Sequence, residues 1–376
     1  TLLAVQGAPD DAAARAARVA EPIMLDGRLD DVEWRLAPPI AGFRQREPNE
    51  GASASDSTVI RILYNDEALY VGILAYNHSG VSTTARILQR DRLLVPGMFG
   101  NIQWGTDDAV ALLFDPFHDH RNAMIFATNP NGAEFEALLT DEGREFNVDW
   151  RAVWRVRAAG FDGGWSAEIE IPFRTLRYPG GDGPQTWGFN VARMVRQTNE
   201  EALWTSWSRD NGGFHRVSRA GHVTGLEDLP RSGLALEAKP FLLGSATQTG
   251  DPGGALSGAP EVGVDLKYQV RPGLTLDLTA NTDFAQVEVD SQQVNLTRFD
   301  LFFPEKRDFF LENAGIFEFG QRLILEPPVM LLFFSRRIGI DEDGEEEVPI
   351  LGGARLTGRV GGQTVGLLNV VTDSAA

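Results

Sequence analysis

The segment Trp165–Ile171 (WSAEIEI) alternates apolar and polar side chains without a break. Strict alternation is the pattern of a strand with one face in a core, and Pro172 then ends the ladder because proline has no backbone donor. Short strand-like runs bounded by Gly, Asp or Asn recur on both sides of it: Arg61–Tyr64, Ala68–Tyr76, Ala109–Phe114, Met124–Thr128 and Trp187–Arg193. The first two predict a hairpin, and the continuous apolar run Ala109–Phe114 predicts a buried strand. Many short strands separated by such turns predict an all-β fold, with an antiparallel β-sandwich over residues 21–229.

The chain changes character after Leu226–Ser232 (LEDLPRS), where we place a domain boundary. Longer alternating strands follow at Val262–Val270 and Leu274–Asn281, and a hairpin is predicted from Gly352–Val360 and Thr364–Val371. Alternating strands of this length are typical of an outer-membrane barrel, although an amphipathic soluble sheet has the same period. We expect residues 233–376 to form a β-rich, partial barrel-like domain with fewer strands than the roughly 8 that a closed barrel needs.

Composition narrows the class of protein. The chain has 34 Lys+Arg against 53 Asp+Glu, a formal net charge of −19 and no cysteine. A nucleic-acid partner needs a basic face, and disulfides, thiolate metal sites and cysteine nucleophiles need cysteine, so these classes are excluded. No apolar run is long enough for a transmembrane helix. Residues 1–20 are interpreted as an N-terminal arm or the remnant of a targeting segment, which favours export to the periplasm or cell envelope.

Several stretches resemble a known family. Ile23–Ala37, Ile60–Tyr76, Asp107–Gly132 and Trp165–Leu176 are similar to a family 9 carbohydrate-binding-module-like sandwich. Asp283–Gly320, with Arg298–Asn313 (RFDLFFPEKRDFFLEN) at its centre, looks like the segment that joins this sandwich to an outer-membrane barrel in a large bacterial family of unknown function. The resemblance implies a sandwich followed by a barrel-type region, here incomplete, and a tryptophan-lined site on the sandwich.

The sequence favours binding over catalysis. It has no G-x-S-x-G elbow, H-E-x-x-H helix or phosphate-binding P-loop, so we expect no enzyme activity. Sugars are bound by aromatic faces flanked by polar groups. Trp34, Trp154 and Trp165 lie in core-like contexts, whereas Trp104 lies in a Gly-rich loop. Trp204 and Trp207 should point to opposite faces of a strand, which makes Trp104 and Trp207 the candidate ligand-binding residues.

Two groups of residues are candidates for metal binding. Asp107, Asp108 and Asp115 bracket one strand and are candidate ligands for Ca²⁺, which prefers oxygen donors. In a strand, His118 and His120 would place both imidazoles on one side and could hold Zn²⁺ or Cu²⁺, but no third ligand is identifiable. A solvated turn is the favoured interpretation of the two histidines.

Aromatic residues also alternate with charges at Phe302–Phe310 (FFPEKRDFF). Phe302, Phe303, Phe309 and Phe310 are candidate contacts for a protein partner, and a small internal core is the equal alternative.

We therefore expect a non-enzymatic binding or docking protein of the bacterial cell envelope, with a carbohydrate-binding-like sandwich that takes an envelope glycan. One alternative is an extrinsic periplasmic subunit that docks on a larger membrane protein complex, for example an energy-transducing one, and is membrane-associated through its partner. A second alternative is a fragment of an outer-membrane barrel protein.

Overall fold

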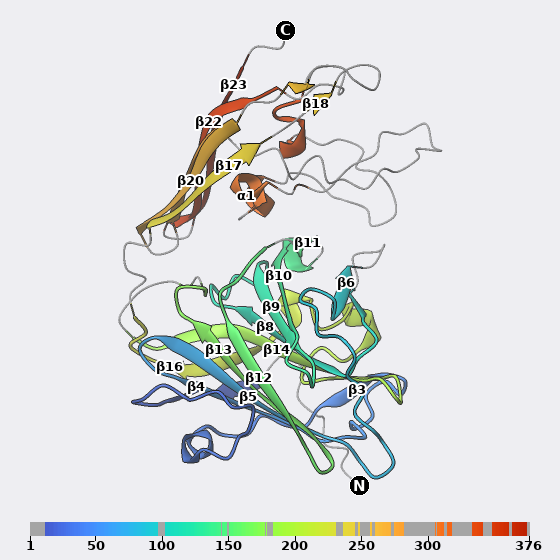
Figure 1. Ribbon diagram of the computed structural model, residues 1–376. Coiled ribbons are helices and arrows are strands. Elements are labelled where there is room, and N and C mark those ends of the chain that lie inside the picture. The colour runs from blue at the N-terminus through green and yellow to red at the C-terminus, as the bar shows by residue number, and fades with distance from the viewer. Residues whose placement is uncertain are drawn as a thin grey trace. The chain divides into compact units, whose positions relative to one another are not determined.

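The computed structural model describes residues 12–96, 102–143, 145–148, 150–176, 178, 183–230, 236–244, 247–248, 256–257, 260–271, 274–281, 305, 307–311, 314–317, 333–340, 348–360 and 363–373. The chain divides into two compact units, Thr1–Ser232 and Gly233–Ala376. Strands form the sheets of both units, so the predicted all-β fold class is confirmed (Figure 1).

The larger sheet of the first unit has nine strands, in the order β1-β16-β14-β8-β9-β10-β11, with β15 paired to β14 and β3 paired to β15. The strands are β1 (Ala13–Arg15), β3 (Arg44–Glu47), β8 (Ala109–Asp115), β9 (Ala123–Thr128), β10 (Glu134–Thr140), β11 (Glu145–Asn147), β14 (Gln185–Val195), β15 (Glu200–Leu203) and β16 (Gly221–Leu226). All residues of β8 are buried, as predicted for a strand covered on both faces.

The second sheet of this unit has five strands, in the order β12-β13-β5-β4-β2. They are β2 (Ala17–Arg18), β4 (Thr58–Tyr64), β5 (Ala68–Tyr76), β12 (Arg155–Phe161) and β13 (Gly164–Pro172). The predicted hairpin of β4 and β5 is present, and its turn is held by Asn65, whose Oδ1 accepts bonds from the amides of Glu67 and Ala68. β1 and β2 pair with sandwich strands, so part of the predicted N-terminal arm belongs to the sandwich.

The apolar faces of the two sheets meet in one core. Trp165, Ile169 and Ile171 of β13 pack there with Phe114 of β8 and Phe189 of β14. The outer faces are also covered. A second apolar cluster lies on the outer face of the nine-stranded sheet and includes Leu113, Phe135 and Phe214. A third, around Trp34 and Tyr70, lies outside the five-stranded sheet. Trp34, Trp154 and Trp165 are buried, as predicted.

Short elements connect these strands. The hairpin of β6 (Leu94–Pro96) and β7 (Ile102–Trp104) forms a small sheet of its own. The described residues of this unit include the 3₁₀ helices η2 (Val32–Leu36), η3 (Asp141–Gly143), η4 (Arg209–Asn211) and η5 (Val217–Arg219). Those of the second unit include η6 (Ala314–Phe317), η7 (Ser335–Arg337) and an α-helical turn, α1 (Asp308–Leu311). None of the helices in the described ranges has the length and apolarity that crossing a membrane requires.

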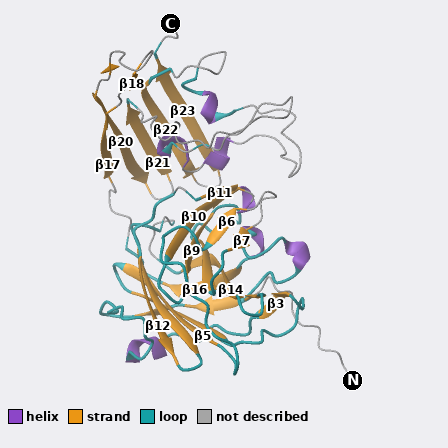
Figure 2. Ribbon diagram, turned by 45° about the vertical axis from the view of Figure 1, so that its right-hand side comes forward, coloured by secondary structure: helices purple, strands orange, loops and turns teal. Residues whose placement is uncertain are grey.

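The second unit contains a five-stranded antiparallel sheet, in the order β17-β20-β21-β22-β23 (Figure 2). Its strands are β17 (Leu236–Gly244), β20 (Pro260–Arg271), β21 (Leu274–Ala280), β22 (Ile350–Val360) and β23 (Gln363–Thr372), and β18 (Thr247–Gln248) pairs separately with β19 (Leu256–Ser257). The predicted hairpin of the last two long strands is confirmed. A barrel-type arrangement of residues 233–376 stays a prediction.

The two faces of this sheet have opposite character. Along β21, Thr275, Asp277 and Thr279 are buried, whereas Leu278 is exposed. Register aligns Asp277 with Arg355 of β22, which is also buried and forms an ion pair with it at 3.3 Å. The opposite face presents exposed leucine and valine side chains, among them Leu242 (73% exposed) and Leu367 (61%). This sheet therefore covers polar groups and exposes apolar ones.

Candidate functional site

The candidate site lies on the outer face of the nine-stranded sheet, where β3 and β15 pair at its edge. Ala202 of β15 points into the core between the sheets, and Leu203 packs in the outer cluster. Because side chains alternate along a strand, Glu201 lies on the outer face with Leu203. On β3, Arg46 contacts Glu201, so this strand contributes its guanidinium groups to the same face.

Trp104 lies at the end of β7 and packs against the outer cluster. Its indole Nε1 donates a hydrogen bond of 3.0 Å to Oε1 of Glu201. One ring face stacks on Phe214, with ring centroids 5.9 Å apart and an interplanar angle of 26°. The Arg196 guanidinium donates to the Trp104 carbonyl at 2.9 Å. Trp104 is therefore a half-buried aromatic held in one orientation, as a binding platform must be.

Trp207 packs against the same outer cluster, whereas Trp204 packs against the core between the sheets, as predicted. The predicted strand, however, ends at Leu203, before both tryptophans. The Arg44 guanidinium lies 5.8 Å above the centre of the Trp207 ring. Gly51 approaches the ring so closely that a Cβ there would lie 3.0 Å from its Cζ3, and its φ of +76° also favours glycine. Ser206 has a φ of 58°, a strained conformation that sets the direction of the following residue.

Two polar atoms near these residues retain hydrogen-bonding capacity. Arg46 Nη1 lies 3.3 Å from Oε2 of Glu201. Within the described part of the chain, Nε of Arg46 and Oγ of Ser206 are buried without a hydrogen-bond partner. Orphaned donors cost about 1–3 kcal/mol each unless a ligand or water completes them. Two indole rings, two guanidinium groups and one carboxylate therefore share this face.

The three aspartates predicted to bind Ca²⁺ do not lie together. Asp107 and Asp108 precede β8, and Asp115 ends it. Asp107 Oδ2 accepts bonds from the amides of Arg86 and Ile87, and Asp108 Oδ1 accepts one from the amide of Arg196. Each carboxylate thus joins separate loops to the strand. No cluster of three metal-ligating side chains is found in the ranges the structure describes, and calcium binding stays a prediction.

Asp115 organises the turn after β8. Its Oδ1 accepts a bond from the amide of Asp119 and its Oδ2 one from the amide of His120, at 3.2 and 2.9 Å. Burial, and then the neighbouring carboxylate of Asp119, raise the pKa of Asp115 to about 7. His118 and His120 lie in this turn rather than in a strand, and burial followed by the two nearby histidines lowers the pKa of His118.

Sequence reasoning missed a third histidine, His222 of β16, which lies beside this turn. Nε2 of His118 lies 3.0 Å from Nδ1 of His222, which is 104 residues later in the chain. Pairing of β16 with β14, and of β14 with β8, brings His222 beside the end of β8. No local sequence signal connects these residues.

The four candidate phenylalanines have different outcomes. Phe302 and Phe303 lie outside the described residues. Phe309 and Phe310 are buried against Ile350 and contact each other edge to face, with ring centroids 4.9 Å apart. Their surroundings are those of a small internal core, the alternative to a partner surface. Arg307 lies over Phe310 at 4.4 Å and donates to both carboxylate oxygens of Glu305 at 2.8 Å, which fixes this turn.

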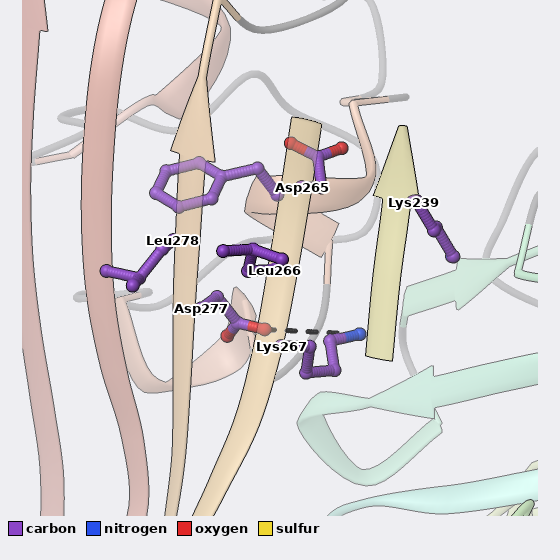
Figure 3. A pocket seen from close by; sticks show the side chains of 7 residues that line it. Lys239, Asp265, Leu266, Lys267, Asp277 and Leu278 are labelled. Carbon is purple, nitrogen blue, oxygen red and sulfur yellow. Dashed lines mark ion pairs between the residues drawn. The ribbon is translucent and has the colours of Figure 1, made fainter. Parts of the chain in front are cut away.

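A small pocket opens on the five-stranded sheet of the second unit (Figure 3). Lys267 and Asp277 face each other across it with 4.0 Å between Nζ and Oδ1. Its other lining residues are Lys239, Asp265, Leu266, Leu278 and Phe309. The volume of about 20 Å³ admits little more than one water molecule, so this pocket is too small for a sugar.

Three comparisons place these features among known proteins. Residues 233–375 match a family model described as a domain of unknown function (DUF5916). No curated protein sequence matches the chain. The family match therefore lies wholly within the second unit.

Solved structures resemble the chain over little more than half of its length. A family 9 carbohydrate-binding module from Caldicellulosiruptor kristjanssonii in complex with cellotriose is 14% identical, with a TM-score of 0.37 over 58% of this chain and 96% of that one. The same kind of module in complex with glucose has 14% identity and a TM-score of 0.38, covering 57% and 97%. A crystal structure of a protein from Bacteroides uniformis is 13% identical, with a TM-score of 0.43 over 56% of this chain and 98% of that one. At these values the ligand of this chain must be argued from its own residues.

Proposed function

We propose that this chain is a non-enzymatic binding protein of the bacterial cell envelope whose sandwich binds a glycan around Trp104 and Trp207. The observation that carries this proposal is the shared face itself: the Trp104 indole is fixed to Glu201, which pairs with Arg46, and Arg44 lies over Trp207. Pyranose rings stack their C–H faces on indoles, and their hydroxyls pair with guanidinium and carboxylate groups. The residues of this face provide both kinds of contact.

A glycan array followed by titration calorimetry of the best ligand tests this proposal. Trp104→Ala and Trp207→Ala should each lower the affinity by at least about 30-fold, as expected when a central aromatic contact of about 2 kcal/mol is removed. Tyr76→Ala is the matched control, because Tyr76 is an exposed aromatic residue on the five-stranded sheet of the sandwich. Absence of glycan binding, or equal losses in all three variants, would refute the proposal.

The second unit supports a further part of the proposal: its apolar face lies against the hydrocarbon of a membrane. Leu236, Leu242, Val262, Leu367 and Val371 are each more than half exposed on one face. The opposite face buries Asp277 and Arg355. Membrane-embedded strands alternate in this way, with apolar side chains outside and polar side chains inside, whereas a soluble sheet buries its apolar face.

Flotation with phosphatidylethanolamine–phosphatidylglycerol vesicles tests the membrane contact. The full chain should float with the vesicles, and Leu242→Asn/Leu367→Asn should reduce the floating fraction severalfold. Leu88→Asn is the control, since Leu88 is 77% exposed in the first unit. If the chain does not bind vesicles but purifies with a membrane protein complex in mild detergent, the apolar face docks on a protein. The better hypothesis is then an extrinsic periplasmic subunit of that complex.

A further inference from the structure

Three of the five histidines of the chain meet at one end of the nine-stranded sheet. His118 and His120 lie in the turn that follows β8, and His222 is the second residue of β16. The ring centroids of His118 and His120 are 4.5 Å apart, and those of His118 and His222 are 5.0 Å apart. The His118 ring therefore contacts both of the other rings.

The distance between two ring nitrogens suits a shared metal ion. Nε2 of His118 and Nδ1 of His222 lie 3.0 Å apart. A divalent transition metal binds imidazole nitrogen at about 2.0–2.1 Å, so two ligands at angles of roughly 90–109° are separated by about 2.8–3.4 Å. The two nitrogens already have this separation. Imidazole donors select Zn²⁺, Cu²⁺ or Ni²⁺ over Ca²⁺ and Mg²⁺, which prefer oxygen.

The turn fixes its histidines at a cost in backbone strain. His118 has a φ of 49° and His120 a φ of 59°, in the left-handed region that L-residues rarely adopt. The carboxylate of Asp115 holds this conformation by accepting the amides of Asp119 and His120. Strain of this kind persists where surrounding contacts over-determine it, and it concentrates at functional sites.

The remaining acidic side chain in the turn is already engaged. Asp119 Oδ1 accepts the amides of Arg121 and Asn122, and its Oδ2 accepts the Asn122 side chain. Asp119 therefore shapes the turn, and the histidines remain as the donors that face one another. No three ligating side chains among the described residues already surround one point, so the third imidazole must rotate to reach a metal.

We propose that His118 and His222 chelate a divalent transition-metal ion, and that His120 rotates to supply the third imidazole. This site is distinct from the proposed glycan face. It lies at the Asp115 end of β8, whereas Trp104 adjoins the loop that enters β8 at its other end. It also uses nitrogen donors, in contrast to the oxygen donors considered for calcium.

Isothermal titration of the full chain with CuCl₂, NiCl₂, ZnCl₂ and CaCl₂ tests the site. One equivalent of Cu²⁺, and of Ni²⁺ or Zn²⁺, should bind, and Ca²⁺ should not compete. His222→Ala and His118→Ala should each weaken Cu²⁺ binding by at least about tenfold, and His120→Ala should weaken it less. His78→Gln is the matched control, because His78 is half exposed and pairs with Asp56 elsewhere in the sandwich.

Two further measurements keep the test decisive. Electron paramagnetic resonance of the Cu²⁺ form should show couplings to nitrogen, and these should decrease in number in His120→Ala. Zn²⁺ should raise the melting temperature of the wild type and of His78→Gln, but not that of the variants at His118, His120 and His222. His222→Gln, which is similar in size, replaces the alanine variant if that variant does not fold. Cu²⁺ binding of unchanged affinity in a folded His222 variant, or no saturable binding by the wild type, would overturn the proposal.

Discussion

The two five-stranded sheets of this protein differ in how their faces are covered. In the sandwich, β13 sends Ile169 and Ile171 into the core, and its outer face is covered as well. There Glu168 accepts hydrogen bonds from the amides of Asp26 and Gly27 and from the Trp34 indole. Both faces of this sheet therefore lie within the protein.

The sheet of the second unit buries one face and exposes the other. Its buried face contains the Asp277–Arg355 ion pair, and its exposed face is apolar. Burial of apolar surface stabilises a fold in water by about 25 cal/mol per Å². The first sheet gains this stabilisation from the chain itself, whereas the second gains it in full only when something apolar covers it. The contrast predicts that the same kind of substitution acts differently in the two sheets.

The largest effect is expected from breaking the buried ion pair of the second sheet. Asp277→Leu leaves Arg355, which is 1% exposed, without its carboxylate, and should destabilise the second unit by about 3–5 kcal/mol. Hydrogen exchange along β21 and β22 measures this loss. Asp277→Leu/Arg355→Leu removes both charges and should recover most of it. A double variant as unstable as the single one would show that the pair is not what stabilises this face.

A slightly smaller effect is expected from the core of the first sheet. Ile169 is fully buried, so Ile169→Ala should lower the free energy of unfolding of the sandwich by about 2–5 kcal/mol. All 8 tryptophans precede residue 233, so tryptophan fluorescence during chemical denaturation reports on the sandwich alone. Ile169→Val is the matched control and should cost about 1 kcal/mol. A loss below 1 kcal/mol for the alanine variant would contradict the burial of this face.

The sequence allowed the inward faces of both sheets to be predicted better than their outer faces. Alternation in Trp165–Ile171 identified the core side of β13, and the hairpin of β4 and β5 follows from its own turn residues. The polar residues of the same pattern, Ser166 and Glu168, lie on the opposite face of β13, yet both are buried. Period 2 separates two faces, but it cannot tell whether a distant segment such as Val32–Leu36 covers one of them.

The candidate sites show the same limit. Trp104 was found because it lies in a Gly-rich loop, and Trp207 because it is three residues from Trp204; the structure packs both against one cluster. The partners that complete the two sites are distant in sequence: Glu201 lies 97 residues from Trp104, and His222 lies 104 residues from His118. Such contacts depend on strand order, which a single sequence does not specify.

Acid should affect the two units in opposite directions. Burial raises the pKa of Glu168. Burial also acts to raise the pKa of Glu305, but the Arg307 side chain outweighs it and lowers that pKa. A raised pKa means that stabilisation is lost as pH rises from about 4.5 to the folded value, and a lowered pKa means that it is lost as pH falls through the folded value.

Unfolding of each unit between pH 3 and pH 8 measures this difference. The sandwich of the wild type should gain stability relative to Glu168→Gln as pH falls toward about 4.5, by at most about 1.4 kcal/mol per pH unit. The second unit should lose stability relative to Glu305→Gln below about pH 4.5. Parallel pH profiles for wild type and variant would show that the carboxyl does not contribute.

The smallest effect distinguishes the two sheets most directly, because it compares adjacent leucines on one strand. Leu368 of β23 packs against the cluster of Phe309, Phe310 and Ile350, whereas Leu367 is exposed on the other face. In water, Leu367→Ala should change the stability of the second unit by less than about 0.5 kcal/mol, and Leu368→Ala should cost about 2 kcal/mol. Hydrogen exchange of β22 and β23 separates the two. Equal losses would mean that the face carrying Leu367 is already packed, and this sheet would then be covered on both faces, as the sandwich sheet is.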